Sequence, residues 1–491
     1  MDDKKATLEL GTKPVGQLLM QYSIPAIIAM TAASLYNMID RIFIGQGCGA
    51  MAISGLAVTF PFMNLSGAFG AAVGVGSSAM ISVKLGQKEY ETAQNIFGNS
   101  IVLNLIVGIS FGLISFIFLD PILRLFGATD QTIPYARDFM QIILLGNVIT
   151  HMFFGMNALL RAASKPKLAM TATIFTVVCN AILDPIFIFK FNLGIRGAAF
   201  ATVLSQALAM IWQLYMFSDK KEFLHFKRGI YRLKWDLIKN IIGIGISPFS
   251  MNATACLVVI FINNELVSHG GNYAVGAYGI GNSIVFIFIM ITMGLNQGMQ
   301  PIAGYNFGAN KYDRMMKVLN YTIIGATICT TTGWIVAEVF PHIFVGLFTI
   351  DKELTAIAVR GLRINAMLMP IVGYQMVITN FFQSIGKAKI SIFLSLSRQL
   401  LFLIPSLIIL PSFFGVDGVW ASLPLSDFIA SLFASWFMIV YMKRFRNHEV
   451  IEDAVDEMNY NYYTPRSGAA PRGMAPQAGA SLYEKVKKTE E

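Results

Sequence analysis

Two acidic residues, Asp40 and Asp184, stand inside long apolar segments of the chain. A carboxylate in apolar surroundings is costly to keep charged, and such residues usually serve a function. Asn180 precedes Asp184 by four residues, so a helix would place both side chains on one face. Thr202, in the next apolar segment, supplies a hydroxyl group. These residue types predict either a proton held between two carboxylates or a small hard cation, such as sodium, bound by oxygen ligands.

Each of these residues also has a purely structural interpretation. Asp40 can form an ion pair at a helix end, because an arginine follows it directly, and Asp184 can hydrogen-bond a helix end before the next proline. The amide of Asn180 and the hydroxyl of Thr202 can join helices by hydrogen bonds. Pro25, about four turns before Asp40, predicts a kink, because proline removes one backbone hydrogen bond from a helix.

A second group of polar residues in apolar segments contains candidates for contacting a bound ligand. Asn37 shares a helix face with Asp40, and Arg398 is the clear cation of the second half, although it can equally pair with Asp427. Soft side chains are frequent, with 26 Met and 38 Phe, which suits a cavity for varied apolar ligands. The candidate lining residues are Asn37, Asn157, Asn282, Gln297, Gln375 and Arg398.

The elements that must position these residues follow from the composition of the chain. Of 491 residues, 55% are hydrophobic and 13% are charged, whereas soluble proteins carry about 25% charged residues. A soluble globular enzyme is therefore disfavoured, and lipid is the alternative solvent. A membrane-spanning helix needs about 20 apolar residues, so the chain has enough for about twelve. Long continuous apolar runs disfavour a β-barrel, whose strands are short and alternating.

The apolar runs predict an all-α integral membrane protein with twelve transmembrane helices. Basic residues indicate the orientation: with both termini in the cytoplasm, the cytoplasmic loops hold about 23 Lys and Arg and the outer loops about 8. This asymmetry, rather than nucleic-acid binding, explains the net charge of +9. The predicted spans are 18–44, 52–82, 92–119, 132–160, 168–190, 196–218, 237–266, 274–305, 315–346, 354–384, 390–413 and 417–442.

The two halves of the chain resemble each other at one fixed offset along the sequence. Gly86–Tyr90 aligns with Gly308–Tyr312, and Ser164–Lys167 aligns with Gly386–Lys389, but the two aspartates have no acidic counterpart. Six spans in each half predict a parallel repeat of two pseudo-symmetric six-helix bundles. The predicted division is 1–17, a cytoplasmic N-terminus; 18–218, the N-terminal lobe; 219–236, a basic cytoplasmic linker; 237–446, the C-terminal lobe; and 447–491, a disordered cytoplasmic tail.

Other chemistries lack the residue patterns that they need. The four cysteines lie far apart in the sequence, without the spacing of a zinc site or a disulfide framework. The sequence has no phosphate-binding GxxxxGK[ST] loop, so ATP is not expected to supply energy. Neither paired carboxylates at a loop mouth nor a Ser–His arrangement is evident, so an enzyme is disfavoured and no cofactor is expected.

Three stretches carry a family likeness, namely Asn37–Gly45, Leu160–Pro166 and Gly294–Gly308. They resemble the MATE (multidrug and toxic compound extrusion) family of transporters, in its MepA-like and DinF-like bacterial branch, and the likeness covers about residues 12–446. The resemblance implies a V-shaped pair of six-helix lobes that exports organic cations, driven by inward flow of protons or sodium. It also implies a bend at the proline of the first span, and a coupling site for the proton or sodium at Asp40, Asn180, Asp184 and Thr202.

We therefore expect a secondary antiporter, a monomer in a bacterial inner membrane, that exports small organic cations by alternating access. By linkage, the coupling ion and the substrate must weaken each other's binding. Two alternative functions stay open. One is a flippase for lipid-linked saccharides, which needs a basic cavity for phosphate, and the other is an exporter of an endogenous metabolite. A duplicated membrane scaffold without transport is a third, non-transport alternative.

Overall fold

A computed structural model describes residues 9–48, 50–348 and 351–446. Within these ranges, the side chains of 35–39, 41, 42, 45, 50, 51, 53, 57, 272 and 443–446 are not described. The tail predicted over 447–491 therefore lies outside the described residues. The chain divides after Tyr441, and the fold below is that of the unit before this point. Every regular element in the described ranges is a helix, which confirms the all-α class.

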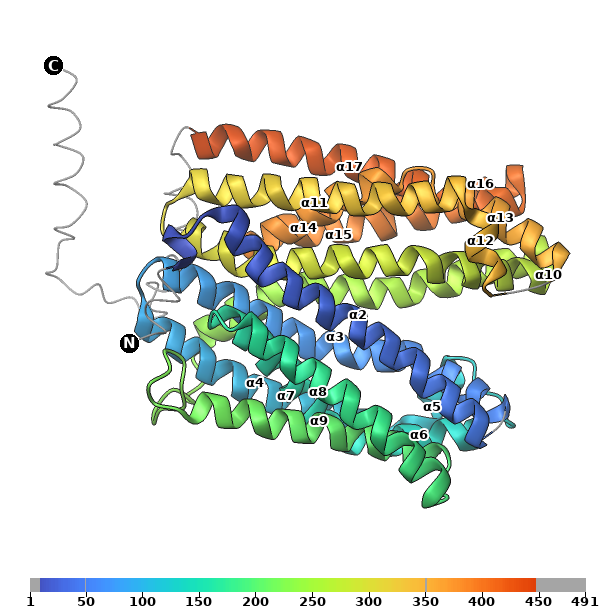
Figure 1. Cartoon of the computed structure of the whole chain (residues 1–491), viewed down its shortest axis with the longest axis horizontal. Helices are drawn as coiled ribbons and strands as arrows, with labels where there is room; N and C mark the ends of the chain where they lie inside the picture. Colours follow the sequence, from blue (N-terminus) through green and yellow to red (C-terminus); the bar gives the residue numbers. More distant parts are fainter. Residues whose placement is uncertain (1–8, 49, 349–350, 447–491) are drawn as a thin grey trace, which may run out of the picture. The chain divides into compact units, whose positions relative to one another are not determined.

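Long helices separated by short loops make up both halves of the chain (Figure 1). The N-terminal half contains α2 (Val15–Cys48), α3 (Ala50–Gly86), α4 (Tyr90–Ile117), α5 (Leu119–Leu125), α6 (Ile133–Leu145), α7 (Asn147–Ala162), α8 (Pro166–Pro185), the π-helical turn η1 (Ile186–Lys190) and α9 (Ile195–Ser218). The C-terminal half contains α10 (Trp235–Gly308), α11 (Tyr312–Val339), α12 (Pro341–Gly346), α13 (Lys352–Ala366), α14 (Met369–Ser384), α15 (Ala388–Leu396), the π-helical turn η2 (Ser397–Leu403), α16 (Ile404–Phe414) and α17 (Val416–Arg446).

Ten helices in the described ranges are long and apolar enough to cross a membrane, and two bent pairs raise the number to twelve if each pair forms one span. α6 and α7 meet at 58°, and α13 and α14 meet at 50°. α10 contains two spans, which join at Gly271, where a φ of 64° interrupts the helix. One predicted span, 315–346, extends too far: α11 ends at Val339, and Pro341 begins a separate helix, as proline commonly does at a first helical position.

The internal repeat is visible in the backbone at the offset found in the sequence. α4 and α11 begin at equivalent positions of the repeat, and so do α7 and α14. The bend between α6 and α7 recurs between α13 and α14. Residues with positive φ also recur at the repeat offset or one position short of it, namely Lys88 with Asn310, Ser164 with Gly386, and Gly194 with Gly415. Because unusual loop conformations repeat together with the helices, the two halves share one architecture.

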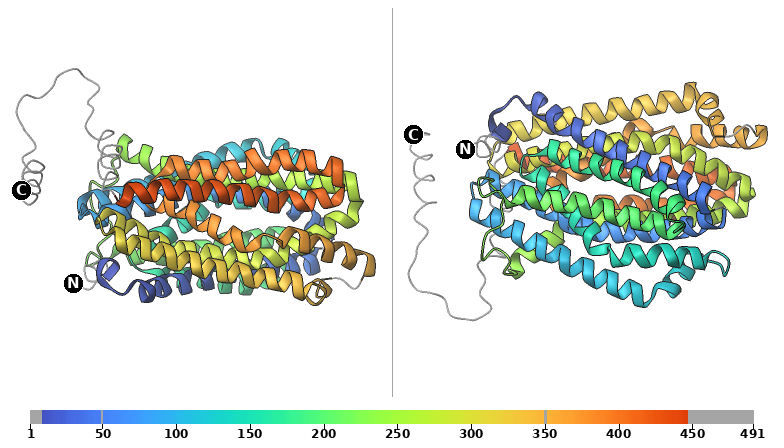
Figure 2. Two further views of the ribbon diagram at one scale, coloured as in Figure 1. Left: turned by 90° about the horizontal axis from the view of Figure 1, so that it is seen from above. Right: turned by 60° about the horizontal axis from the view of Figure 1, so that its bottom comes forward.

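Each half has a hydrophobic core of its own. Both cores lie at the end of the bundle that is farther from residue 9, the first described residue. One core joins Ile44 and Leu56 with Met140 and Ala199, all from the N-terminal half. The other is built entirely from the C-terminal half and centres on the buried side chain of Trp420. The two views of Figure 2 show the long helices running side by side, with the loops gathered at two ends.

The two halves meet mainly where α2 and α3 pack against α10. A Cβ atom on Gly76 of α3 would overlap the backbone of Ile241, and one on Gly245 of α10 would overlap the backbone of Ala72. Small residues therefore allow these helices to approach backbone to backbone, as is common between membrane helices. Figure 1 shows α2 beginning beside α11, from the C-terminal half, and continuing alongside α8 of its own half.

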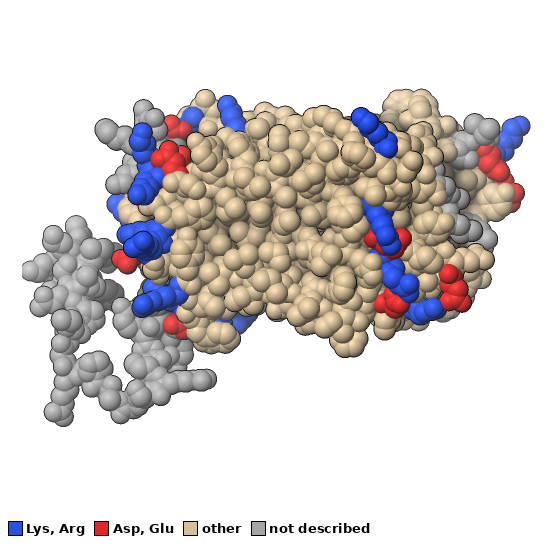
Figure 3. Space-filling view, turned by 90° about the horizontal axis from the view of Figure 1, so that it is seen from below, with Lys and Arg blue, Asp and Glu red and all other residues tan. Residues whose placement is uncertain are grey.

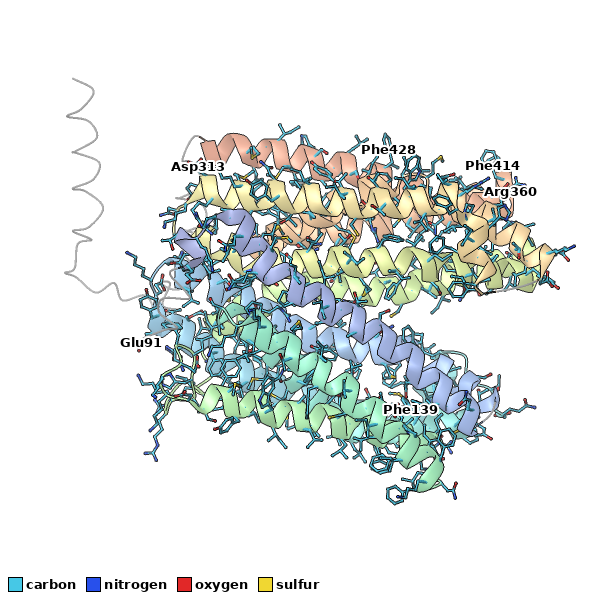
Figure 4. The ribbon with its side chains drawn as sticks, in the orientation of Figure 1. Glu91, Phe139, Asp313, Arg360, Phe414 and Phe428 are labelled. Carbon is cyan, nitrogen blue, oxygen red and sulfur yellow. The ribbon has the colours of Figure 1, made fainter. Side chains whose placement is uncertain are left out.

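On the face shown in Figure 3, charged side chains gather toward the two ends of the bundle, with a band of uncharged surface between them. One end, which we call the basic end, carries the loops at 87–89, 163–165, 219–234, 309–311 and 385–387. Glu91 and Asp313, which are equivalent positions of the internal repeat, both lie at this end, whereas Arg360 and Phe414 lie at the opposite end (Figure 4). At the opposite end the arginines pair with acids, as Arg360 does with Asp417 and Arg196 with Asp138.

One of these pairs predicts a pH effect at the opposite end. Arg137 Nε donates to Asp120 Oδ1 over 2.8 Å and Nη2 donates to Oδ2 over 2.5 Å, and this hydrogen bonding holds the pKa of Asp120 below its usual range. A lowered carboxylate pKa stabilises the folded state above the unfolded pKa of about 4, and this contribution is lost as the pH falls through the folded pKa. We therefore expect Arg137→Gln to lower the melting temperature slightly at pH 7, and the difference from wild type to shrink as the pH falls below about 4.

Thermal unfolding of the purified protein across this pH range measures the effect. Lys352→Gln, an exposed change at the same end, is the control and should leave the melting temperature unchanged at every pH. A difference for Arg137→Gln that stays constant down to pH 3 would contradict the assignment.

Candidate functional site

The helices α2, α8 and α9 pack against one another within the N-terminal half (Figure 1). α8 ends at Pro185 and continues directly into the π-helical turn η1. Proline has no backbone N–H to donate, so the regular hydrogen-bond ladder is interrupted at this point. Asp184 therefore directly precedes the proline at which the helix changes type, and π-helical turns are frequent at functional sites.

Four side chains named from the sequence lie together at this meeting point. The carboxyl groups of Asp40 and Asp184 lie close enough to interact electrostatically. With the Asn180 amide oriented to satisfy both of its ends, its nitrogen donates to Asp184 Oδ2 over 2.8 Å and its oxygen accepts from the backbone N–H of Thr202 over 3.2 Å. In the other orientation the nitrogen is 3.4 Å from both Asp184 Oδ1 and Thr202 Oγ1. We call these four residues the carboxylate cluster.

The carboxylate cluster is shielded from solvent. The exposed fraction is 7% for Asp40, 1% for Asn180, 0% for Asp184 and 5% for Thr202. Two interacting carboxylates at such a site cannot both remain charged without compensation, so a proton or a cation is favoured there. The side chains offer oxygen ligands, which suit a hard cation. Among the described residues, no group of three or more His, Cys, Asp or Glu side chains could hold a metal ion.

Two further residues from the sequence analysis belong to α2. Pro25 is buried within α2, and the helix continues on both sides of it. Asn37 lies three residues before Asp40, but its side chain is outside the described residues.

Asn157, a candidate lining residue, lies inside the N-terminal half on the basic side of the carboxylate cluster. Its amide nitrogen donates to Thr173 Oγ1 over 2.9 Å, and its oxygen accepts from Arg161 over 2.9 Å. Asn157 is 7% exposed. Its amide thus joins α7 to α8, and the structural interpretation of this residue accounts for all the contacts that we observe.

The other lining candidates are spread over the C-terminal half. Gln297 of α10 reaches across to α2, where its amide nitrogen lies 3.5 Å from the sulfur of Met30. Gln375 is buried in α14 and donates to Thr379 over 3.3 Å, whereas Asn282 is exposed. Arg398 of η2 forms an ion pair with Asp427 of α17, as the alternative interpretation held.

Sequence reasoning missed a buried polar network in the N-terminal half. Ser66 donates to Asn147 Oδ1 over 2.6 Å and lies 3.4 Å from His151 Nε2, while Asn147 donates to the carbonyl of Gly108 over 3.0 Å. His151 is 0% exposed. A histidine in the middle of the predicted span 132–160 was the available signal, because ionisable residues inside membrane spans are rare.

An all-α, internally duplicated bundle with a buried carboxylate cluster in one half defines a multi-pass membrane transporter. The family model named MatE matches residues 25–186 and 248–408, one match in each half of the chain. The chain belongs to the MatE family, which confirms the family predicted from the three sequence stretches.

Curated relatives and solved structures agree with this assignment. The chain is 30% identical over 428 residues to the multidrug export protein MepA of Staphylococcus haemolyticus (strain JCSC1435), covering 87% of this chain and 94% of that protein. It is 28% identical over 433 residues to MepA of Staphylococcus aureus (strain MSSA476), covering 88% and 95% respectively. A crystal structure described as MATE in the bent conformation has the same fold, with a TM-score of 0.85, 22% identity, and coverage of 91% of this chain and 99% of that one.

Proposed function

We propose that this protein is a secondary antiporter that exports organic cations, including drugs, in exchange for protons or sodium. The observation that carries the proposal is the carboxylate cluster, because a buried pair of carboxylates with an amide and a hydroxyl can gain and lose a cation. The relatives named multidrug export proteins support the substrate class. Aromatic, positively charged compounds are the substrates that we expect, with an endogenous metabolite as the alternative physiological cargo.

Binding of a proton or sodium ion would change the charge of the cluster and so bias the packing of α2 against α8 and α9. An ion can shift a conformational equilibrium only by its difference in affinity for the two states. By linkage, the ion must weaken substrate binding as much as the substrate weakens ion binding. Exchange of the two across the membrane then follows without any ATP.

The distribution of basic residues supports an orientation of the protein in the membrane. We propose that the basic end faces the cytoplasm of a bacterial inner membrane, because cytoplasmic loops carry an excess of Lys and Arg. Both termini would then be cytoplasmic, and a monomer would be the working unit, since each chain carries both halves. The contacts between the halves that involve residues 10–30 lie toward the basic end, so in the proposed orientation this arrangement would be closed on the cytoplasmic side.

The flippase alternative is less favoured by the geometry of Arg398. A flippase would need basic side chains available to phosphate. Arg398 Nη1 is 3.0 Å from Asp427 Oδ1, so its charge is already compensated within the C-terminal half.

Transport by membrane vesicles tests the proposal. Everted vesicles from cells expressing the chain are supplied with ethidium as the probe, and the proton and sodium gradients are imposed separately. We expect ethidium to be accumulated under one of the two gradients, which identifies the coupling ion, and not in vesicles from cells without the protein. Ethidium uptake that is equal with and without the protein under both gradients would contradict drug–ion antiport.

A further inference from the structure

The segment that leads into α2 is held by the opposite half of the protein. Asn306 Nδ2, at the end of α10, donates to the carbonyl of Leu10 over 3.0 Å. Arg314, at the start of α11, donates to the carbonyl of Leu10 over 3.3 Å and to that of Lys13 over 2.5 Å. Arg314 Nε also donates to Asn306 Oδ1 over 3.2 Å, which orients the amide toward Leu10.

A third donor completes this contact. Lys311 Nζ donates to the carbonyl of Gly11 over 2.8 Å. Leu10 is 0% exposed, and a Cβ atom on Gly11 would lie 2.9 Å from the ring of Tyr305. The leading segment is therefore fitted against the C-terminal half. We call the donor set Asn306, Lys311 and Arg314 the first lock.

The segment that leads into α10 is held in the same manner by the N-terminal half. Asn99 of α4, which is 0% exposed, donates to the carbonyls of Ile230 over 3.2 Å and Arg232 over 3.1 Å. Its amide oxygen accepts from the backbone N–H of Lys234 over 2.9 Å. Gly98 leaves the space that the backbone of Ile230 occupies. We call Asn99 the second lock.

The two locks are reciprocal. Leu10 and Arg232, whose carbonyls accept these bonds, are equivalent positions of the internal repeat. Each precedes the first long helix of its own half, and each is held by side chains of the other half. Near them, a Cβ atom on Gly86 would overlap the backbone of Tyr305, and one on Gly308 would overlap that of Val83, a second pair of contacts related by the same repeat.

We propose that the two locks hold the basic end of the protein shut, and that it opens only when their side chains release the carbonyls of the two leading segments. This inference rests on the proposed alternating-access function and names residues that set its resting state. Arg314 carries the largest share of the first lock, because it is a charged donor that binds two carbonyls and also orients Asn306, whereas Lys311 binds one carbonyl. At Gly86 and Gly308 the helices pack too closely to leave room for a Cβ atom. Helices packed this closely separate in one step rather than by gradual deformation, so we expect the basic end to be either closed or open.

The distance between two spin labels at the basic end measures its opening directly. Lys88 of the N-terminal half and Lys317 of α11 are both exposed, and each is replaced by cysteine in the full chain without its four native cysteines, in lipid nanodiscs. We expect the wild type to show mainly the short distance between the labels. Arg314→Gln and, separately, Asn99→Ala should each raise the population with the longer distance about tenfold or more.

Two variants make the result specific to the locks. Arg314→Lys keeps the charge and should restore much of the short-distance population, which a simple loss of folded protein would not produce. Arg228→Gln removes an exposed charge from the linker at the same end and should leave the distances unchanged. Unchanged distances in both Arg314→Gln and Asn99→Ala, measured on folded protein, would overturn the locks. The outcome is separate from the ethidium test, because distances are read without any substrate or gradient.

Discussion

Replacing Asp184 by asparagine is expected to lower gradient-driven ethidium transport by about 5- to 150-fold, the range that a coupling free energy of about 1–3 kcal/mol gives. Asparagine fills nearly the same space as aspartate but cannot bind a proton or balance a sodium ion. The hydrogen bond between Asn180 and position 184 can persist, so the fold has little reason to change. Asp40→Asn should have the same effect, because the two buried carboxyl groups interact within one cluster.

The two variants also make a prediction about each other. If both carboxylates belong to one ion site, the double variant should transport no worse than either single variant, because residues that act as a unit are not additive. Transport rates at equal protein levels in vesicles provide the measurement. Asp130→Asn, which changes an exposed acid at the opposite end with a side chain 88% exposed, is the matched control and should transport like the wild type.

An Asp184→Asn protein that still transports ethidium with the wild-type dependence on both gradients would remove the coupling role from the carboxylate cluster. Loss of transport together with loss of folded protein would instead indicate a packing role. Circular dichroism and a size-exclusion profile of each variant therefore accompany the transport assay.

The second large effect is expected at the ion pair between Arg398 and Asp427. The side chains are only 27% and 16% exposed, and the two charges are 3.0 Å apart. Arg398→Leu leaves the carboxylate of Asp427 without its partner in a poorly solvated place, which typically costs about 3–5 kcal/mol. We expect the melting temperature in detergent to fall by about 5 °C or more.

The double variant Arg398→Leu with Asp427→Leu separates charge from packing. Removing both charges together should recover most of the lost melting temperature, since a hydrophobic pair of similar volume often replaces a buried ion pair without cost. A double variant that is as unstable as Arg398→Leu would contradict this account. The same protein also tests the lining role: if Arg398 contacts substrate, the stable double variant should still show an altered selectivity among cationic and anionic dyes.

The site shows how far residue types and spacing can lead. Asp40, Asn180, Asp184 and Thr202 were selected because polar groups inside apolar segments are rare and because helical spacing placed two of them on one face. The structure brings all four into one cluster. Asn157 and Arg398 satisfied the same criterion of polarity, but the structure gives each a partner in its own half. A polar residue in a membrane span therefore needs a hydrogen-bonding or charged neighbour. Which neighbour it has, and so whether its role is structural or functional, is seen only in the structure.

The two locks could not be predicted from the sequence, for a different reason. Asn306 belonged to a stretch that identified the family, yet its partner is a backbone carbonyl in the opposite half of the chain, and every residue type offers such a carbonyl. Asn99 likewise binds the backbone of the linker, where the basic side chains had suggested only the orientation of the protein. A hydrogen bond to a backbone carbonyl does not require any particular residue type at the accepting position, so the sequence cannot indicate it.

By itself, the sequence determined the all-α class, the family and the internal repeat, because each depends on hydropathy, length or local motifs along the chain. The twelve predicted spans match the structure if each bent pair is counted as one span. Only the tertiary structure decided that two spans are bent pairs and that Arg398 pairs with Asp427. It also decided that His151 belongs to a buried polar network in the N-terminal half, and that each half holds the leading segment of the other. These features depend on which distant segments touch, and in an apolar chain many helix faces are similar enough that hydropathy cannot choose among them.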